Sequence, residues 1–273
     1  MTRYRMYQVD AFTDRLFAGN PAGVMPLEEW LPDQTLQAIA AENNLAETAF
    51  IIPEGPGRYH LRWFTPGVEV PLCGHATLAT AHVLWTEEKI AADCLTFETL
   101  SGELRVERAG GRYKMDFPAD PPVPIDLPLG MTEALEGNPV AMLAGQYLMA
   151  RFGSQAEIEA LSPDFRALSS IRTERGRGAA EDCVVATAPG KDGYDFVSRF
   201  FGPTVGIDED PVTGSAHCML APYWAAELGK SELKARQISP RGGDLLCTVE
   251  GDRVLLEGSC VTYLRGEIEL ASS

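Results

Sequence analysis

The sequence has little positive charge. Its 273 residues carry 23 Lys and Arg side chains against 39 Asp and Glu, which gives a formal net charge of −16. Proteins that bind nucleic acid rely on Lys and Arg clusters to displace counterions, and polybasic membrane anchors need charge of the same sign. The charge balance therefore argues against a nucleic acid or a membrane surface as the partner.

Long hydrophobic runs are also missing. No apolar stretch approaches the roughly 20 residues of a membrane-spanning helix. The first residues, Met1–Arg5, lead directly into a strand-like pattern without the apolar core of a signal peptide. The expectation is a soluble protein of the cytoplasm. The cysteines are scattered with no C-x-x-C pair, which indicates reduced thiols; they are Cys73, Cys94, Cys183, Cys218, Cys247 and Cys260.

Several well-known catalytic motifs are absent. The sequence contains no phosphate-binding loop, no dinucleotide-binding glycine fingerprint, no G-x-S-x-G elbow and no H-E-x-x-H. Cys73 and His75 form a C-x-H pattern, but without a second ligand pair this is a weak zinc signal. We therefore expect no cofactor and no metal. The arginine cluster Arg172, Arg175 and Arg177, with its two glycines, is most simply an exposed loop.

The length and the proline distribution predict two domains. A prior of about 150 residues per domain gives roughly two for this chain. Five of the eleven residues from Pro118 to Pro128 are proline, which excludes a helix or a central strand there and indicates a linker. The predicted domains are residues 1–118 and 119–273.

Short strands dominate the predicted secondary structure. One helix is predicted near Gln34–Asn43, capped by Asp33, with Leu36, Ile39 and Ala40 on one face. The predicted strands lie near Tyr4–Ala11, Thr48–Ile52, His60–Phe64, Tyr113–Phe117, Gln146–Phe152, Cys183–Ala188 and Phe196–Phe201.

The two halves of the chain resemble each other. Three short segments of the first half recur in the second, and their spacing rises in order along the chain, as small insertions would produce. Two copies of one domain, related by a pseudo-twofold axis, explain this pattern. The matching pairs are Arg62–Pro66 with Arg199–Pro203, Glu69–Ala76 with Glu209–Ala216, and Gly102–Leu104 with Gly243–Leu245.

Each copy contains one helix without charge. No charged side chain occurs from Ala76 to Trp85 or from Ala216 to Trp224. A helix that is apolar all round is buried on all sides, so we place each helix at the centre of a wrapped sheet. Pro222 departs from helix chemistry and is expected to kink or shorten the second helix.

The starts of these two helices are candidate anion sites. A helix N-terminus presents unpaired backbone N–H groups and the positive end of the helix dipole. If the duplication places the two ends face to face, Gly74-His75 and Gly214-Ser215 could hold a carboxylate or a developing enolate between them. The alternatives are that the glycines serve tight turns and close packing, and that Ser215 is only a helix cap.

Two acidic positions are candidates for proton transfer. Glu47 is the one charge at the start of an apolar strand, and burial raises the pKa of a carboxyl toward neutrality. The alternative is a solvated glutamate at a strand end. Asp210 and Glu209 precede the second uncharged helix, where helix capping is the alternative role.

At this point the residues resemble the PhzF (phenazine biosynthesis) family. The resemblance runs essentially from end to end and rests on five linked motifs in order. The family has a diaminopimelate epimerase-like α+β fold, in which two pseudo-symmetric β-barrel domains each wrap a central helix and the active site lies between them. The motifs are Tyr7–Phe12 with Gly19–Val24, Asn44–Phe50, Phe64–Pro66, Leu72–Thr77 and Glu209–Ala216.

The resemblance implies roles for individual residues. Glu47 matches the family's proton-shuttling glutamate, and His75 and Asp210 match its polar partners. Gly74 and Ser215, with Gly214, match the groups that hold the substrate carboxylate, and Asn20 matches a pocket-lining position.

The resemblance also implies a reaction and an assembly. The reaction is similar to the isomerisation of trans-2,3-dihydro-3-hydroxyanthranilate, in which a proton leaves one ring carbon and returns at another. Members are typically cytoplasmic homodimers that need no cofactor, so the implied partners are a small carboxylate substrate and a second copy of the chain. By analogy the last strand, around Val261–Leu270, returns to the first domain.

Two other functions stay open. An epimerase or racemase of the same superfamily would use paired cysteines, but the position that duplicates Cys73 is Thr213, whose hydroxyl cannot act as a thiolate base. A hydroxyproline-type dehydratase that uses Cys73 alone stays open. A non-catalytic protein that binds a small molecule in the same cleft is the second alternative. The combination of Glu47, His75 and Asp210 argues against it.

Overall fold

The computed structural model of the protein describes residues 1–173 and 182–271. The chain forms two structural units, one made of Met1–Asp116 with Glu257–Ser273 and the other of Phe117–Leu256, called unit 1 and unit 2 below. Arg175 and Arg177 of the arginine cluster lie outside the described residues. Among the helices that are described, none has the length and apolar character needed to cross a membrane.

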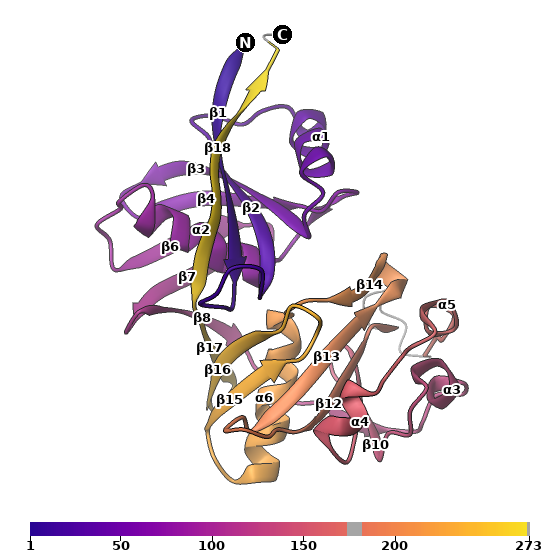
Figure 1. The fold of residues 1–273 in the computed structure, drawn as a ribbon. Helices are drawn as coiled ribbons and strands as arrows, with labels where there is room; N and C mark the ends of the chain where they lie inside the picture. The colour runs from indigo at the N-terminus through magenta and orange to yellow at the C-terminus, as the bar shows by residue number, and fades with distance from the viewer. Residues whose placement is uncertain (174–181, 272–273) are drawn as a thin grey trace. The chain divides into compact units, whose positions relative to one another are not determined.

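Unit 1 consists mainly of β-strands around one central helix (Figure 1). Its helices are α1 (Asp33–Asn43) and α2 (Gly74–Thr86). Its strands are β1 (Thr2–Ala11), β2 (Asn20–Pro26), β3 (Glu47–Gly55), β4 (Arg58–Phe64), β5 (Glu69–Val70), β6 (Cys94–Thr99), β7 (Gly102–Ala109), β8 (Arg112–Pro118) and β18 (Cys260–Leu270).

Unit 2 repeats this composition with additional short helices. Its helices are α3 (Met131–Leu135), α4 (Gln155–Glu159), α5 (Phe165–Leu168), the 3₁₀ turn η2 (Pro203–Val205) and the long α6 (Gly214–Leu228). Its strands are β9 (Val123–Ile125), β10 (Ala141–Ala144), β11 (Leu148–Arg151), β12 (Val184–Pro189), β13 (Phe196–Gly202), β14 (Ile207–Asp210), β15 (Glu232–Gln237), β16 (Gly243–Glu250) and β17 (Arg253–Gly258).

The strand pairings confirm the internal repeat. In unit 1, β1–β2 is antiparallel, β2–β3 parallel, β3–β4 antiparallel, β4–β6 parallel and β6–β7 antiparallel. In unit 2, the pairs β10–β11, β11–β12, β12–β13, β13–β15 and β15–β16 follow the same order of directions. In each unit a parallel crossover therefore carries the long helix, α2 or α6, between two strands of the same sheet.

The repeat extends to individual side-chain contacts before the long helices. Arg62 binds Glu69 with two hydrogen bonds of 2.7 and 2.8 Å, and Arg199 binds Glu209 with two of the same lengths. Planar, two-point pairing of this kind fixes geometry as well as charge. The turn that follows is also held alike, because Ser101 Oγ donates to the carbonyl of Pro71 at 2.8 Å and Ser239 Oγ to that of Pro211 at 2.8 Å. The chain therefore enters both long helices on a fixed path.

The two long helices are buried, as the absence of charge predicts. Every residue of α2 from His75 to Trp85 is buried. In α6, the buried residues include Ala216–Ala221 and Trp224. Both helices thus form the centres of their units, and their N-terminal residues are held rigidly in place by packing on all sides.

From the sequence, Pro222 is expected to kink or shorten α6, and the helix is not shortened. The helix continues to Leu228, six residues beyond the proline. A proline cannot donate to the carbonyl four residues earlier, which here belongs to Cys218. The backbone N–H of Asp120 donates to that carbonyl at 3.0 Å instead. The lost helical hydrogen bond is replaced by one from a distant segment.

The predicted cap of α1 is wrong. The helix begins at Asp33 itself, its N-cap is Pro32, and no side chain caps it by a hydrogen bond. The Asp33 carboxylate instead pairs with Arg62 Nη1 at 2.9 Å. The predicted core face is confirmed, since Leu36, Ile39 and Ala40 are buried.

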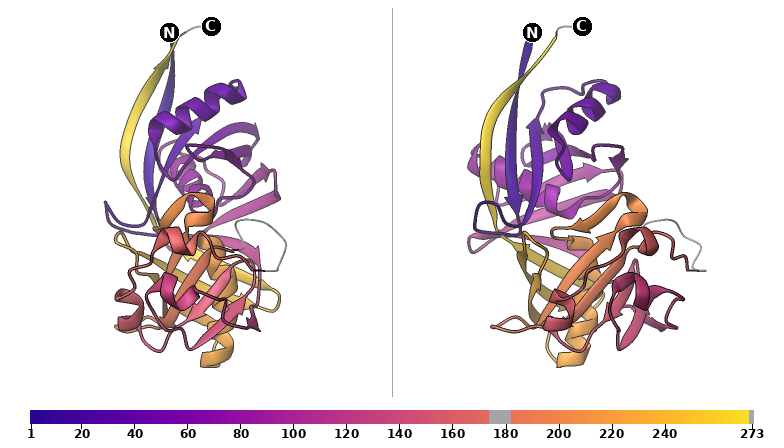
Figure 2. Two further views of the ribbon diagram at one scale, coloured as in Figure 1. Left: turned by 90° about the vertical axis from the view of Figure 1, so that its right-hand side faces the viewer. Right: turned by 45° about the vertical axis from the view of Figure 1, so that its right-hand side comes forward.

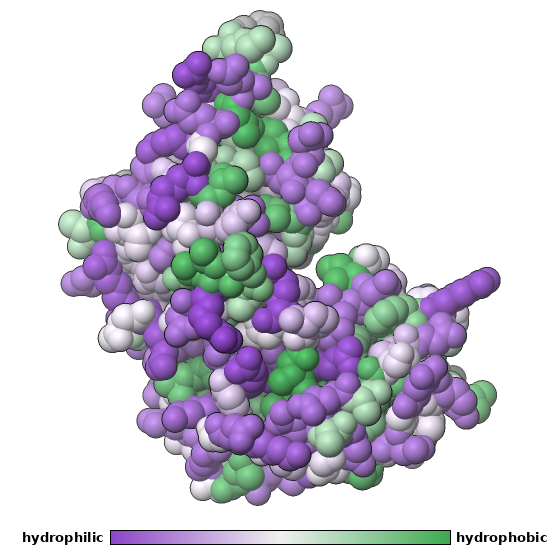
Figure 3. All heavy atoms as spheres, viewed as in Figure 1, coloured by the Kyte–Doolittle hydropathy of each residue, from purple (hydrophilic) through white to green (hydrophobic). Residues whose placement is uncertain are grey.

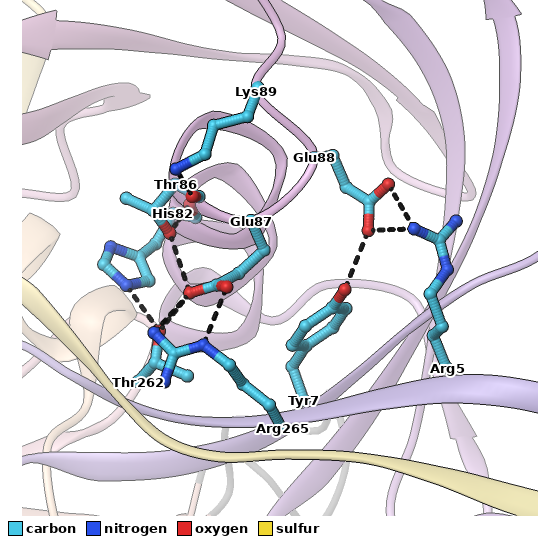
Figure 4. A network of polar contacts seen from close by, with 9 residues as sticks. All are labelled: Arg5, Tyr7, His82, Thr86, Glu87, Glu88, Lys89, Thr262 and Arg265. Carbon is cyan, nitrogen blue, oxygen red and sulfur yellow. Dashed lines mark hydrogen bonds and ion pairs between the residues drawn. The ribbon is translucent and has the colours of Figure 1, made fainter.

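A polar network holds strands β1 and β18 at the C-terminal end of α2 (Figure 4). Glu87 accepts hydrogen bonds from Arg265 and Thr262, and Glu88 accepts them from Arg5 and Tyr7. Two carboxylates at a helix C-terminus oppose the helix dipole, so these partners compensate an unfavourable placement. The network fixes one end of the helix whose other end carries His75.

Strands β1 and β18 run side by side along unit 1 in all three ribbon views (Figures 1 and 2). They pair antiparallel from Thr2 with Leu270 to Ala11 with Cys260, with one bulge at Gln8 and Val9. The outer surface is mostly hydrophilic on the face drawn in Figure 3, with separate small apolar patches.

Candidate active site

Two neighbouring elements of unit 1 carry the candidate acid–base residues. Glu47 is the first residue of β3, and β3 lies parallel to β2 with Ala22 opposite Glu47. Its side chain is only 13% exposed, so it is not the solvated strand-end glutamate of the alternative interpretation. Cys73 is the N-cap of α2, Gly74 its first residue and His75 its second. The buried helix fixes all three at its N-terminal end.

The His75 imidazole lies between a thiol and a carboxylate. Its Nδ1 is 3.5 Å from Cys73 Sγ, and its Nε2 is 3.1 Å from Glu47 Oε2. Cys73 and His75 are both buried. In hydrolytic enzymes, a histidine between a nucleophile and a carboxylate acts as the base, and the carboxylate orients the ring. The same arrangement of Cys73, His75 and Glu47 can also support proton transfer.

The charges of this cluster follow from burial and from the neighbours. Burial raises the pKa of Cys73 to about 11, with a further increase from the Glu47 carboxylate, so Cys73 is a neutral thiol near pH 7. Burial lowers the pKa of His75, but its contacts with the Cys73 sulfur and the Glu47 carboxyl group outweigh burial and hold the pKa of His75 well above its usual value. Near neutral pH these shifts favour a protonated His75 imidazole beside a neutral Cys73 thiol.

The raised pKa of Cys73 predicts its reactivity. At pH 8 only about one Cys73 in a thousand is a thiolate, so iodoacetamide should label exposed Cys94 first. Since only the thiolate reacts, the rate at Cys73 should rise about tenfold per pH unit until the pH approaches the pKa of about 11. Peptide mapping by mass spectrometry after timed labelling measures both rates. Labelling of Cys73 at pH 8 as fast as Cys94 would contradict this charge state.

The Gly19-Asn20 motif has a steric origin. Gly19 has φ +65°, and a Cβ at this position would lie 2.1 Å from the carbonyl oxygen of Ala11. Only glycine fits there, and the tight approach sets where β2 begins. Asn20 is the first residue of β2, pairs with Ala11 and is completely buried.

The candidate residues of unit 2 cluster at the start of α6. Asp210 ends β14, and its carboxylate accepts a hydrogen bond from the Thr213 hydroxyl. Buried Gln237 spans the turn, because its Nε2 donates to the Asp210 carbonyl at 2.7 Å and its Oε1 accepts from Thr213 N–H at 2.9 Å. Asp210 is thus fixed by the turn and does not cap α6, whose N-cap is Thr213 without a side-chain hydrogen bond.

Ser215 is the second residue of α6, after Gly214, and is not its cap. Its hydroxyl lies 2.8 Å from the hydroxyl of Tyr147, which comes from the turn between β10 and β11. Tyr147 is buried and its ring meets that of Phe200 edge to face at 4.9 Å. Burial raises the pKa of Tyr147 to about 12, so its hydroxyl is protonated at neutral pH.

Sequence reasoning named the residues at the helix ends but missed the residues that support them. Tyr147 and Gln237 touch Ser215 and Thr213 from positions 68 and 24 residues away. Their only signal in the sequence would have been a polar residue, Gln237, at the end of an otherwise alternating strand.

Known proteins agree with this architecture. A family model described as phenazine biosynthesis-like protein matches residues 9–266. The chain belongs to the PhzF family. An uncharacterised isomerase of Pseudomonas aeruginosa is 49% identical over 265 residues, which cover 97% of this chain and 98% of the relative. An uncharacterised isomerase of Halalkalibacterium halodurans is 43% identical over 268 residues, with 97% and 98% covered. These PhzF relatives place the chain among the isomerases of the family.

Solved structures show the same fold. The crystal structure of a PhzF-family protein of Enterococcus faecalis matches with a TM-score of 0.93 and 43% identity, covering 98% of this chain and 100% of that one. The predicted α+β, epimerase-like fold of the PhzF family is therefore confirmed.

Proposed function

We propose that this PhzF-family protein is a cofactor-independent isomerase that moves a proton between two carbons of a small cyclic or aromatic-like carboxylic acid. Glu47 is the acid–base group. The observation that carries the proposal is the placement of its carboxylate, largely buried and 3.1 Å from the His75 imidazole. A buried carboxylate with one fixed partner can take a proton from one carbon and return it to another.

The proton moves in two steps. The Glu47 carboxylate removes a proton from one carbon of the substrate, which leaves the electron pair on the conjugated acid. The resulting Glu47 carboxylic acid then delivers the proton to a different carbon. The His75 imidazolium supports the first step from one side, because its positive charge favours the negative charge that develops on the substrate.

The substrate carboxylate would bind at helix N-termini. Gly74 and Gly214 begin the two buried long helices, where free N–H groups and the helix dipole favour an anion. We assign Ser215 to carboxylate binding, Asp210 to proton movement and Asn20 to the pocket wall. Substrates like trans-2,3-dihydro-3-hydroxyanthranilate fit this chemistry. We also propose that the protein is cytoplasmic and acts as a homodimer. Light scattering of the purified chain tests the homodimer.

Cys73 supports a second candidate function. Its thiol lies 3.5 Å from His75 Nδ1, so a proton-transfer role of the thiol, as in an epimerase or a dehydratase, is the specific competitor. We expect Cys73→Ser to keep most of the isomerase activity, because the thiol is neutral and Glu47 carries the proton. NMR of a panel of cyclic acids with wild type and variant measures this. Loss of all activity in Cys73→Ser, together with activity that survives Glu47→Gln, would favour the thiol mechanism.

Tyr147 should affect binding more than turnover. The variant Tyr147→Phe keeps the ring contact with Phe200 but removes the hydroxyl that orients Ser215. Loss of one hydrogen bond in a binding site costs about 1 kcal/mol, so we expect the KM for a carboxylate substrate to rise about fivefold with kcat little changed. Steady-state kinetics of Tyr147→Phe, Ser215→Ala and the double variant test this. Effects that add in the double variant would contradict the coupling of Tyr147 to Ser215.

A further inference from the structure

The cluster in unit 1 combines three side chains that commonly ligate zinc. Cys73, His75 and Glu47 offer a thiol sulfur, an imidazole nitrogen and a carboxylate oxygen, and these atoms all lie within 4.8 Å of one another. Within residues 1–173 and 182–271 this is the only group of three such side chains. Glu47 is distant from the C-x-H pattern in the sequence, so the pattern alone lacked the third ligand.

The His75 ring approaches Cys73 and Glu47 about as closely as neighbouring ligands approach each other in a tetrahedral metal site. Zinc bonds of about 2.0 Å to nitrogen or oxygen and about 2.3 Å to sulfur place neighbouring ligand atoms about 3.3–3.6 Å apart. The observed distances are 3.1 Å between Glu47 Oε2 and His75 Nε2, and 3.5 Å between Cys73 Sγ and His75 Nδ1. The two distances end on different nitrogens of the ring, so a cation bound at one nitrogen requires the Cys73 or the Glu47 side chain to turn toward it. One ligand atom from each residue already lies within 4.8 Å of the other two.

Two of the donor atoms are buried without a hydrogen bond. Glu47 Oε2 and His75 Nε2 face each other closely, yet neither makes a hydrogen bond of acceptable geometry with any described group. Buried polar atoms normally have such a partner, and its absence indicates a missing ion, water or ligand. Their only close polar contact among the described residues is the 3.1 Å approach to each other, and a cation bound by both atoms would take its place.

The second copy of the domain lacks this chemistry. In unit 2 the positions that correspond to Cys73 and His75 are Thr213 and Ser215. Their neutral hydroxyls are poor ligands for zinc compared with a thiolate and an imidazole. The repeat therefore predicts one metal site in each chain, in unit 1. Unit 2 has the same local fold without these metal ligands.

We propose that Cys73, His75 and Glu47 bind one thiophilic divalent cation of the zinc class in unit 1. With three protein ligands, the fourth coordination position is left to water or to a substrate oxygen. Binding forms a bond from the metal to each of Cys73 Sγ, His75 Nε2 and Glu47 Oε2. The thiol proton and the Nε2 proton leave to the buffer, and no oxidation state changes.

The bound cation blocks the acid–base carboxylate, so zinc inhibits the isomerase. Only this consequence rests on the proposed function, because metal binding itself needs no turnover. The cation is therefore an inhibitor and not a cofactor, because it competes with the shuttled proton for the same oxygen of Glu47.

The test is titration of the full-length, tag-free protein with Co²⁺ alone under anaerobic conditions. We expect one equivalent of Co²⁺ to bind and to produce a thiolate-to-cobalt charge-transfer band with strong tetrahedral d–d absorption. Subsequent Zn²⁺ should displace Co²⁺ and remove both features. Absence of stoichiometric binding, or an octahedral spectrum without the thiolate band, would overturn the proposal.

Variants assign the ligands without reference to activity. Cys73→Ser should abolish the charge-transfer band, and Glu47→Gln should weaken Co²⁺ binding while keeping the band. Cys94→Ser, at an exposed cysteine, is the matched control and should bind like wild type. A second measurement guards against misfolded variants: in the wild-type protein, Zn²⁺ should protect Cys73 but not Cys94 from alkylation at high pH. A band that persists in Cys73→Ser, or no protection of Cys73, would show that the cation binds elsewhere.

Discussion

Replacement of Glu47 by Gln should reduce isomerase turnover by about 10²–10⁴-fold, the range that general acid–base groups contribute. Glutamine has nearly the same shape and can still contact His75, but it cannot accept a proton from carbon. The fold should be unchanged, since Glu47 begins β3 and pairs through its backbone with β2. Steady-state rates measured by NMR on a responsive cyclic acid, with circular dichroism for the fold, give the comparison.

The control for this variant lies on the same strand. Glu54 is also part of β3, is more exposed, and lies 3.9 Å from His60, away from the cluster of Cys73 and His75. Glu54→Gln should therefore turn over substrate like wild type. Equal activity of Glu47→Gln and wild type would exclude the carboxylate as the proton carrier.

The variant Trp224→Ala should destabilise unit 2 by about 3–5 kcal/mol, the usual cost of deleting a large buried aromatic side chain. Trp224 is 1% exposed on α6, and its ring stacks on Phe196 with centroids 5.8 Å apart. Its indole N–H donates to Thr187 Oγ1 at 2.9 Å. The substitution thus leaves both a cavity and a buried hydroxyl without its donor. Urea denaturation followed by circular dichroism measures the free energy of unfolding.

The adjacent residue provides the matched comparison. Tyr223 lies on the same turn of α6 but is only partly buried, so Tyr223→Ala should cost clearly less. Both variants replace a large aromatic residue by alanine at neighbouring positions of α6. The difference between their losses of unfolding free energy therefore measures the effect of burial. A loss in Trp224→Ala no larger than in Tyr223→Ala would contradict the placement of α6 as the centre of unit 2.

The sequence predicted the strands and the repeat well because both depend on local patterns. The strand predicted near His60–Phe64 is observed as Arg58–Phe64, and the one near Phe196–Phe201 as Phe196–Gly202. Alternation of apolar residues and paired motifs are visible without knowledge of distant contacts. The same reasoning placed the uncharged helices at the centres of their units.

The errors came from contacts between residues that are far apart in the chain. Asp33 looks like a helix cap, but Arg62 from strand β4 takes its carboxylate. Pro222 suggests a kink or a shorter helix, but the N–H of Asp120 donates to the Cys218 carbonyl and the helix continues to Leu228. Neither partner has a spacing that marks it in the sequence.

The candidate site shows the same division. Cys73 and His75 are close because they are neighbours at one helix end, and that closeness can be read from the motif. Their contact with Glu47 depends on how β3 lies against α2, and the contact of Tyr147 with Ser215 depends on a turn 68 residues earlier. Residue types suggested the acid–base group, but only the structure pairs it with His75.

Solvent deuterium incorporation tests the central claim most directly. A responsive carboxylic acid is incubated in deuterated water with wild type and with Glu47→Gln, and its C–H positions are followed by NMR. The account predicts that wild type moves or exchanges hydrogen at two defined carbons and that Glu47→Gln does neither. Equal hydrogen movement by both proteins would contradict it.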